Sequence, residues 1–350
     1  MTVLIVIVNY RTATLAIDCL RSLVPVIARR PGTTVEVVDN ASNDGSVEQI
    51  IAATVHFGWG DWVRITPSSR NGGFAAGNNV SLRPALMLRT PPDYFWLLNP
   101  DTTVAADALE SLVQFLDTNK RVGIAGSRIL EPGTPGPIAF RFPSLIGELD
   151  NGLGLSPFSR LVRRWTTVQH LSDQPKRVDW VAGASMLVRR EVLLSAGPMD
   201  EEYFLYYEET DFCLQALRAG WTCWYVPTSH VTHFAGASTG LGSTRPALAR
   251  RPKYWFDSRR RYFIKNHSRL YASIVDLIWL AAHETRRLRK RLRLARQPLE
   301  SDEYVADFIR YSALSNGTGT GHQKFTHSPR HARAAAQRSD PNGSQVNERG

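Results

Sequence analysis

The chain has 350 residues, which is enough to bury one large hydrophobic core or two modest ones. Its hydrophobic content of 43% and charged content of 21% are typical of a soluble globular protein. The net charge of +10 makes nucleic acid a candidate partner. The charge is unevenly spread, however, because residues 286–297 alone hold seven basic side chains with apolar residues between them. A basic run beside an apolar run points first to an anionic membrane surface.

The apolar runs are too short for a membrane-spanning helix, and the nearest candidate, residues 270–282, includes Asp276. Only two residues precede the first apolar run, so we interpret residues 3–8 as a strand and not as a signal peptide. Cys19, Cys213 and Cys223 form no Cys-x-x-Cys pair. We expect packed thiols in a reducing compartment, and therefore a cytoplasmic protein.

The first 125 residues alternate between apolar strand-like runs and segments with helical spacing, which predicts a mostly parallel sheet with right-handed crossovers. A helix over residues 14–23 is expected to stop at Pro25. The predicted strands are residues 3–8, 35–38, 62–65, 94–98 and 122–125. Further helices are predicted from residue 47, from the loop 71–79, and over 105–116.

From residue 131 to residue 177 the pattern fades into Gly, Pro and scattered aromatics, which predicts a less regular segment over the cleft. Residues 178–188 and 221–226 predict strands, and residues 190–196 and 208–219 predict helices. After Ser315 the chain is rich in Gly, Ser, Asn, Arg and His, which predicts a disordered tail.

Asn99 and Asp101 directly follow the predicted strand 94–98, at the carboxyl edge of the sheet. Open α/β sheets bind ligands at that edge. A carboxylate there can hold a divalent metal, and the metal can hold a diphosphate. The same Asn-Pro-Asp sequence is also an ordinary turn signal, so the tripeptide alone leaves both interpretations open.

Three other polar positions allow two interpretations each. Asp39 ends the second predicted strand and could contact a nucleobase or ribose, or could cap a turn. The glycine-rich loop 71–79 could approach a nucleotide closely, although it matches neither the P-loop nor the dinucleotide fingerprint. His233 could be a metal ligand or an ordinary surface histidine.

Glu208, Glu209 and Asp211 place three carboxylates in four residues at the start of a predicted helix. Acidic residues favour the first turn of a helix because of the helix dipole. The apolar neighbours Leu205 and Phe212 indicate a second interpretation, because such surroundings raise the pKa of a carboxyl group toward that of a useful base.

In their order along residues 3–270, these motifs resemble inverting family 2 glycosyltransferases, and among them the bacterial rhamnosyltransferase-like members. The resemblance rests on residues 3–10, 38–46 (VDNASNDGS), 71–74 (NGGF), 97–101 (LLNPD), 180–190, 204–211 (FLYYEETD) and 233–238 (HFAGAS). It implies the GT-A fold, in which a nucleotide-binding α/β half is fused to an acceptor-binding half. We therefore expect a mostly parallel, mixed sheet flanked by helices.

The resemblance also implies a division of the chain. We expect a glycosyltransferase domain over residues 1–265, with a nucleotide-binding half (1–125) and an acceptor-binding half (126–265). A basic, amphipathic helical region would follow over residues 266–314, and the disordered tail over 315–350.

By resemblance, Asp101 and His233 would hold Mg²⁺ or Mn²⁺, and Glu209 would be the catalytic base, with Glu208 as its rival and Asp211 beside them. The sequence departs from the family at Asn99, where Asp-x-Asp has its first Asp, and at Glu209, where relatives carry Asp. Gln215 stands where an Arg is often found. The residues expected to bind the donor are Asn9, Tyr10, Asp39, Asn40, Asn71, Gly72, Gly73 and Asn99.

The expected activity is metal-dependent, inverting transfer of a sugar, with rhamnose as a candidate, from a dTDP- or UDP-linked donor. The acceptor would be a hydroxyl of a glycan or polyprenyl-linked molecule in cell-envelope polysaccharide synthesis. A nucleotidyltransferase that makes sugar nucleotides is the runner-up, but residues 9–12 lack the glycine-rich loop that it would carry after the first strand. Nucleic-acid binding is disfavoured because the basic run lacks interleaved aromatics that stack bases.

Residues 271–296 combine an apolar face, which includes Ile274 and Leu277, with the following basic run. This pattern predicts a peripheral helix on the cytoplasmic leaflet. A terminal helix packed on the core, with a solvated basic end, is the alternative.

Overall fold

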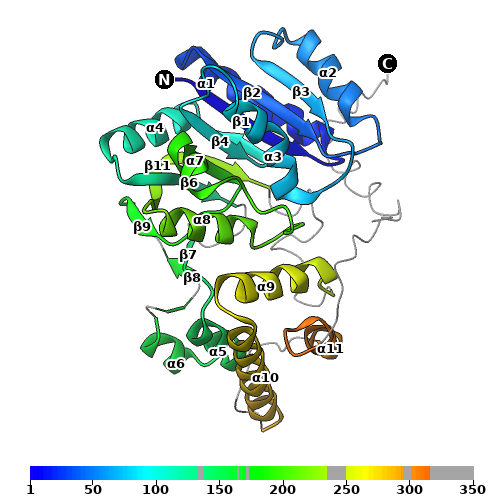
Figure 1. The fold of residues 1–350 in the computed structure, drawn as a ribbon, viewed down its shortest axis with the longest axis vertical. Helices are drawn as coiled ribbons and strands as arrows, with labels where there is room; N and C mark the ends of the chain where they lie inside the picture. The colour runs from blue at the N-terminus through cyan, green and yellow to red at the C-terminus, as the bar shows by residue number, and fades with distance from the viewer. Residues whose placement is uncertain are drawn as a thin grey trace, which may run out of the picture. The chain divides into compact units, whose positions relative to one another are not determined.

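A mixed nine-stranded sheet forms the centre of the computed structural model, with strand order β3-β2-β1-β4-β10-β6-β11-β5 and β9 paired to β11 (Figure 1). Strands β1 to β4, β6 and β11 run parallel to one another, whereas β5, β9 and β10 run antiparallel to their neighbours. The predicted mostly parallel, mixed sheet is therefore confirmed. The structure describes residues 1–131, 138–163, 165–166, 168–170, 173–234, 250–292, 294 and 301–315.

The strands of this sheet and of a small second sheet are β1 (Val3–Asn9), β2 (Thr33–Asp39), β3 (Val63–Pro67), β4 (Tyr94–Leu98), β5 (Thr102–Val104), β6 (Val122–Leu130), β7 (Ile138–Phe140), β8 (Val168–His170), β9 (Lys176–Val178), β10 (Ser185–Arg189) and β11 (Thr222–His233). The helices are α1 (Ala13–Arg29), α2 (Ser46–His56), α3 (Gly73–Leu86), α4 (Ala108–Thr118), α5 (Leu145–Leu153), α6 (Ser156–Leu161), α7 (Arg190–Ala196), α8 (Glu208–Arg218), α9 (Lys253–Asn266), α10 (Arg269–Arg291) and α11 (Asp302–Tyr311).

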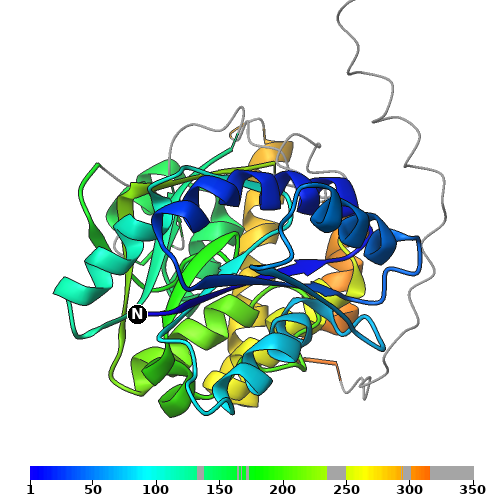
Figure 2. The ribbon, with the colours of Figure 1, turned by 90° about the horizontal axis from the view of Figure 1, so that it is seen from above.

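Strand β1 is buried along its whole length because helices cover both faces of the sheet. Val3, Ile5 and Ile7 pack with apolar side chains of α1 and α4 on one face. Leu4 and Val6 pack with those of α3, α7 and α8 on the other. Figure 2 shows α1 in blue and α3 in cyan on opposite sides of the sheet.

Helix α1 runs through Pro25, so the predicted stop at this residue is wrong. A proline in a helix interior costs about 3 kcal/mol, mainly through a lost hydrogen bond and a clash with the preceding turn. Pro25 lies on the exposed side, whereas Leu23 and Val26 are buried under the sheet. Burial of the residues around the proline offsets its cost.

The segment between residues 131 and 177 is more regular than predicted, because it contains α5 and α6. Ser144 caps α5 by accepting a hydrogen bond from the Gly147 amide. Helix α5 packs on α10, where a Cβ atom at Gly152 would lie 2.7 Å from the Cβ of Ala282. The predicted strand 178–188 is likewise divided into β9 and β10 by a loop over residues 179–184.

A buried ion-pair cluster joins the helices that follow the sheet. Arg259 of α9 donates to Glu148 Oε2 of α5 at 2.6 Å and pairs with Asp276 of α10. The second carboxylate oxygen of Asp276 accepts from the Ala313 amide at 2.7 Å. Residues 1–315 form one compact unit, and the domain limits given above stay a prediction. The tail predicted after Ser315 lies beyond the described residues.

Candidate active site

Parallel pairing brings the polar ends of β1, β2 and β4 together at one edge of the sheet. The register places Asn9 opposite Asp39, and Ile7 opposite Leu98, the residue before Asn99. Because parallel strands share a direction, the residues that follow them meet at the same edge. This edge holds the residues expected to bind a donor.

Asp39 is only 2% exposed, and its carboxylate is held by its own surroundings. Asn9 Nδ2 donates to Asp39 Oδ1 at 2.8 Å, and the Ser42 amide donates to Oδ2 at 3.0 Å. By accepting the hydrogen bond from the Ser42 amide, Asp39 caps the turn that follows β2, which is one of the two roles that its sequence position allows. Asn9 is fully buried, so in this geometry it orients Asp39, whereas Tyr10 is partly exposed beside it. Contact of these residues with a donor stays a prediction.

Asn40 fixes the loop before α3 through its side-chain amide. Its Nδ2 donates to Asn71 Oδ1 at 2.9 Å and to the Gly73 carbonyl at 3.0 Å, and its Oδ1 accepts from the Gly72 amide at 3.3 Å. Expected donor-binding residues from two loops therefore form one hydrogen-bonded group. The group leaves the start of α3 in a fixed place.

Gly73 is the point where this loop touches the segment that carries the acidic cluster. Its φ is +83°, and a Cβ atom there would lie 1.8 Å from the Phe204 carbonyl oxygen. The next amide, that of Phe74, donates to the same oxygen at 3.0 Å. A backbone at positive φ this close to another backbone requires glycine.

The pairing of β5 with β11 brings His233 to Asp101. Register places His233 opposite Thr102, and the Phe234 amide donates to the Asp101 carbonyl at 2.9 Å. His233 Nε2 lies 3.2 Å from Asp101 Oδ1 and 3.4 Å from Asn99 Nδ2. Burial lowers the pKa of His233, but the hydrogen bond and charge of Asp101, with those of Glu131, raise the pKa above its usual value overall.

The chemistry of these side chains fits a divalent cation. Two ligands of one ion, each bonded at about 2.1 Å, lie about 3 Å apart, which is close to the separation of Asp101 Oδ1 and His233 Nε2. Within the described residues, no group of three or more His, Cys, Asp and Glu side chains could hold a metal. An ion here would take its remaining ligands from diphosphate oxygens and water, as Mg²⁺ commonly does.

Glu131 is a site residue that the sequence analysis missed. Its Oε1 lies 3.3 Å from Nδ1 of His233, the nitrogen that faces away from Asp101. A carboxylate in this place fixes the tautomer and orientation of a ligating imidazole. Strand β6 was predicted to end at residue 125 and instead continues to Leu130, which carries Glu131 to the edge of the sheet, and no local sequence pattern indicates its contact with His233.

The acidic cluster opens α8 after two left-handed residues, Tyr206 (φ 71°) and Tyr207 (φ 67°). Glu209 Oε1 accepts from the Gly183 amide at 3.0 Å. The next residue in that loop, Ala184, accepts from the Asn99 amide at 3.4 Å. One short loop therefore contacts both Glu209 and the segment that carries Asp101.

Glu208 and Glu209 differ in their environments. Burial raises the pKa of Glu208 well above its usual range, and the charge of Glu209 adds to this rise. Burial also raises the pKa of Glu209, although the hydrogen bond from Gly183 offsets part of the rise. Glu208 Oε2 has no hydrogen-bond partner among the described residues, whereas Glu209 is partly exposed. The pKa of each carboxyl group is thus raised, which is the direction that strengthens a general base.

The side chain of Asp211 points away from that of Glu209 and toward α9. It is 2% exposed and accepts from Lys265 Nζ at 2.6 Å and from Asn266 Nδ2 at 2.7 Å, both on α9. Gln215, one helical turn later, donates to the same carboxylate at 3.3 Å. These contacts tie α8 to α9, and the expected catalytic part of Asp211 stays a prediction.

A family model described as "Glycosyltransferase like family 2" matches residues 2–255. The chain belongs to this family. It is a glycosyltransferase. The N-acetylglucosaminyl-diphospho-decaprenol L-rhamnosyltransferase of Mycobacterium tuberculosis is 27% identical over 284 residues, covering 75% of this chain and 90% of that protein.

Two solved structures share the fold. GalNAc-T7, with UDP, GalNAc and Mn²⁺, matches with a TM-score of 0.54 and 16% identity, covering 89% of this chain and 57% of the other. The mannosyltransferase PcManGT from Pyrobaculum calidifontis, in complex with GDP-Man and Mn²⁺, matches with a TM-score of 0.52 and 14% identity, covering 85% of this chain and 76% of the other.

The environment of Glu208 predicts a pH-dependent stability difference. Because its pKa is raised on folding, the folded state resists losing the proton, and the wild type loses stability as pH rises from the unfolded pKa, about 4.3, through the raised pKa. Glu208→Gln cannot ionise and lacks this loss. Urea unfolding of both proteins should show the stability difference shifting in favour of the variant as pH rises. A difference that is constant over this range would contradict the prediction.

Proposed function

We propose that this glycosyltransferase moves a sugar, with rhamnose as the first candidate, from a dTDP- or UDP-linked donor to a hydroxyl of a glycan or polyprenyl-linked acceptor. The reaction would invert the anomeric centre and would serve cell-envelope polysaccharide synthesis on the cytoplasmic side. The observation that carries the proposal is the loop at Gly183 and Ala184, which contacts Glu209 on one side and the Asn99 backbone on the other. The Mycobacterium tuberculosis relative, by its name, supports the choice of sugar and acceptor.

The residues divide into three tasks. Asn40 and the loop from Asn71 to Gly73 form one hydrogen-bonded group at the carboxyl edge, beside the buried Asp39, and these residues would position the nucleoside. Asp101 and His233 would hold Mg²⁺ or Mn²⁺, as the Mn²⁺ in both solved neighbours suggests. When bound, the ion would neutralise the negative charge that develops on the leaving diphosphate.

Glu209 would take the proton of the acceptor hydroxyl. The hydroxyl oxygen then forms a bond to the anomeric carbon while the bond from that carbon to the diphosphate oxygen breaks on the opposite face. Single displacement in this manner inverts the anomeric configuration. The raised pKa of Glu209 suits this task, because a stronger base accepts the proton more readily.

Asp101 should be required for the binding of metal together with nucleotide. With the wild type, UDP or dTDP plus Mn²⁺ should raise the melting temperature more than either alone, because ligands that bind only the folded state stabilise it. Asp101→Ala should remove this added shift and abolish transfer. Asp61→Ala, which changes an exposed acid between α2 and β3, is the matched control and should keep the shift. Full activity of the wild type in EDTA would contradict the metal dependence.

Glu209→Gln should lower kcat by about 10²–10⁴-fold, the usual contribution of a general base. Donor affinity and melting temperature should change little, because the nucleotide and metal are expected to be held by other loops. The same substitution at Glu208 should instead weaken acceptor binding or change stability. Steady-state kinetics of Glu209→Gln, Glu208→Gln and Asp211→Asn decides which residue is the base. If Glu209→Gln keeps near-normal turnover and one of the other two variants loses it, the base is the residue changed in that variant.

The proposed membrane contact rests on one face of α10. Four exposed apolar side chains lie at successive spacings of four, three and eleven residues, which places them along one stripe: Leu270, Ile274, Leu277 and Leu288. The opposite face, with Ala272, Val275 and Trp279, is buried against the other helices. The helix therefore packs on the core and also presents an apolar stripe beside the basic residues near its end. Within the described residues, no helix has the length and apolar character to cross a membrane.

Ile274→Ser combined with Leu277→Ser should weaken binding to anionic vesicles, because the exposed stripe would lose apolar area. The matched control is Met87→Ser with Leu88→Ser, two exposed apolar residues at the end of α3. Flotation with vesicles of phosphatidylglycerol and phosphatidylcholine measures the bound fraction. Equal flotation of the wild type and the α10 variant would refute the proposed contact.

A further inference from the structure

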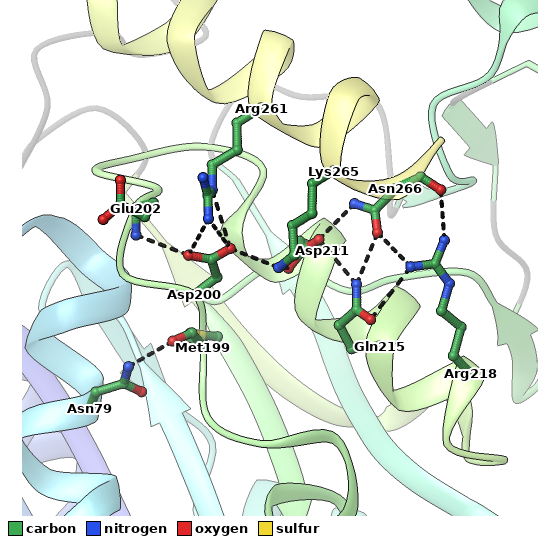
Figure 3. A network of polar contacts seen from close by, with 10 residues as sticks. All are labelled: Asn79, Met199, Asp200, Glu202, Asp211, Gln215, Arg218, Arg261, Lys265 and Asn266. Atoms are coloured by element: carbon green, nitrogen blue, oxygen red, sulfur yellow. Dashed lines mark hydrogen bonds and ion pairs between the residues drawn. The ribbon is translucent and has the colours of Figure 1, made fainter. Parts of the chain in front are cut away.

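The first turn of α8 is anchored from behind by α9. Asp211 is buried in this turn and contacts Lys265 and Asn266 of α9, as Figure 3 shows. Residues two apart on a helix point about 200° apart, so Glu209 faces away from this contact. Its carboxylate accordingly reaches the Gly183 amide. Helix α9 thus contacts one side of the first turn of α8, and the proposed base, Glu209, lies on the other side.

Lys265 holds this segment at two places. Its Nζ lies 2.7 Å from Asp200 Oδ2 and 2.6 Å from Asp211 Oδ2. Asp200 Oδ2 also forms an ion pair with Arg261 of α9, whose Nη2 lies at 2.7 Å. The segment from Asp200 to Asp211, which includes the left-handed residues Tyr206 and Tyr207, is therefore pinned to α9 at both ends (Figure 3).

The same segment is held from the donor side. Asn79 of α3 donates to the Met199 carbonyl at 2.7 Å, and the Phe74 amide donates to the Phe204 carbonyl at 3.0 Å. Contacts from α3 alone would fix its beginning and middle, but they do not reach the first turn of α8. The ion pair of Lys265 with Asp211, together with the hydrogen bond that Asn266 donates to the same carboxylate, attaches this turn to α9.

We propose that Lys265 is a positioning residue, which fixes Glu209 by neutralising and holding Asp211 behind it. A carboxylate buried to this degree is costly unless it is paired, so loss of the cation should shift or loosen the turn. The inference rests on the proposed function, because it assumes that Glu209 is the base.

The position of Gln215 allows the positive charge that pairs with Asp211 to be moved from α9 to α8. It lies four residues after Asp211 on α8 and already donates to that carboxylate at 3.3 Å. Side chains four apart on a helix are neighbours, so an arginine at position 215 could pair with Asp211 from within α8. The present sequence has a neutral residue there, and among the described residues the cation that pairs with Asp211 comes from α9.

The test compares Lys265→Met, Lys265→Arg and the double variant Lys265→Met/Gln215→Arg with the wild type. Lys253→Met is the control, since it removes an ion pair with Asp257 that lies within α9. Lys265→Met should lower kcat about 10- to 100-fold through misplacement of the base, with little change in the donor KM. Amide hydrogen exchange should become faster over residues 204–212 and stay unchanged over residues 71–74. Lys265→Arg and the double variant should recover both readouts, and the control should match the wild type.

Normal kcat and exchange in Lys265→Met would overturn the inference. A loss that the double variant does not recover would overturn it too, and this includes a failure of both variants to fold. Hydrogen exchange needs no substrate, so it tests the anchoring even if the wild type shows no transfer. Absence of transfer in the wild type would count against the proposed function and not against the anchoring of α8.

Discussion

The structure depends on a backbone contact between the two sides of the site, where Gly73 meets Phe204. The contact needs a residue without a side chain at positive φ, and it brings the donor loop against the segment that leads to Glu209. The sheet alone would collect Asp39 and Asn99 at one edge, but it would leave the acidic turn of α8 unplaced. This contact, the Gly183 loop and the anchoring by α9 together place Glu209 near the strand ends.

Much of the fold could be predicted from the sequence, because aliphatic runs such as that of β1 are buried on both faces. Local patterns failed where tertiary packing decided the outcome. Pro25 is accommodated inside α1 because the residues around it bury apolar surface. Helix α5 was missed because its packing surface is α10, more than a hundred residues later, and its glycines lower the helical signal.

The candidate site was predictable as a set of residue types and not as a geometry. Asp101 could be assigned to a strand end, but its approach to His233 follows from the register of β5 against β11, which no local pattern reveals. Glu131 and Lys265 were missed for the same reason, since each acts on a residue far away in the sequence. The glycosyltransferase family is shown by the match over residues 2–255, whereas the individual roles of these residues are proposals.

The most direct test of the account is to locate a metal and a nucleotide in crystals grown with Mn²⁺ and UDP or dTDP. Anomalous scattering should place Mn²⁺ within bonding distance of the carboxylate of Asp101 and of Nε2 of His233. The diphosphate should lie on the metal, with the carboxylate of Glu209 facing the open side where an acceptor would enter. Mn²⁺ bound elsewhere, or a nucleotide away from Asp39 and the Asn71–Gly73 loop, would contradict the account.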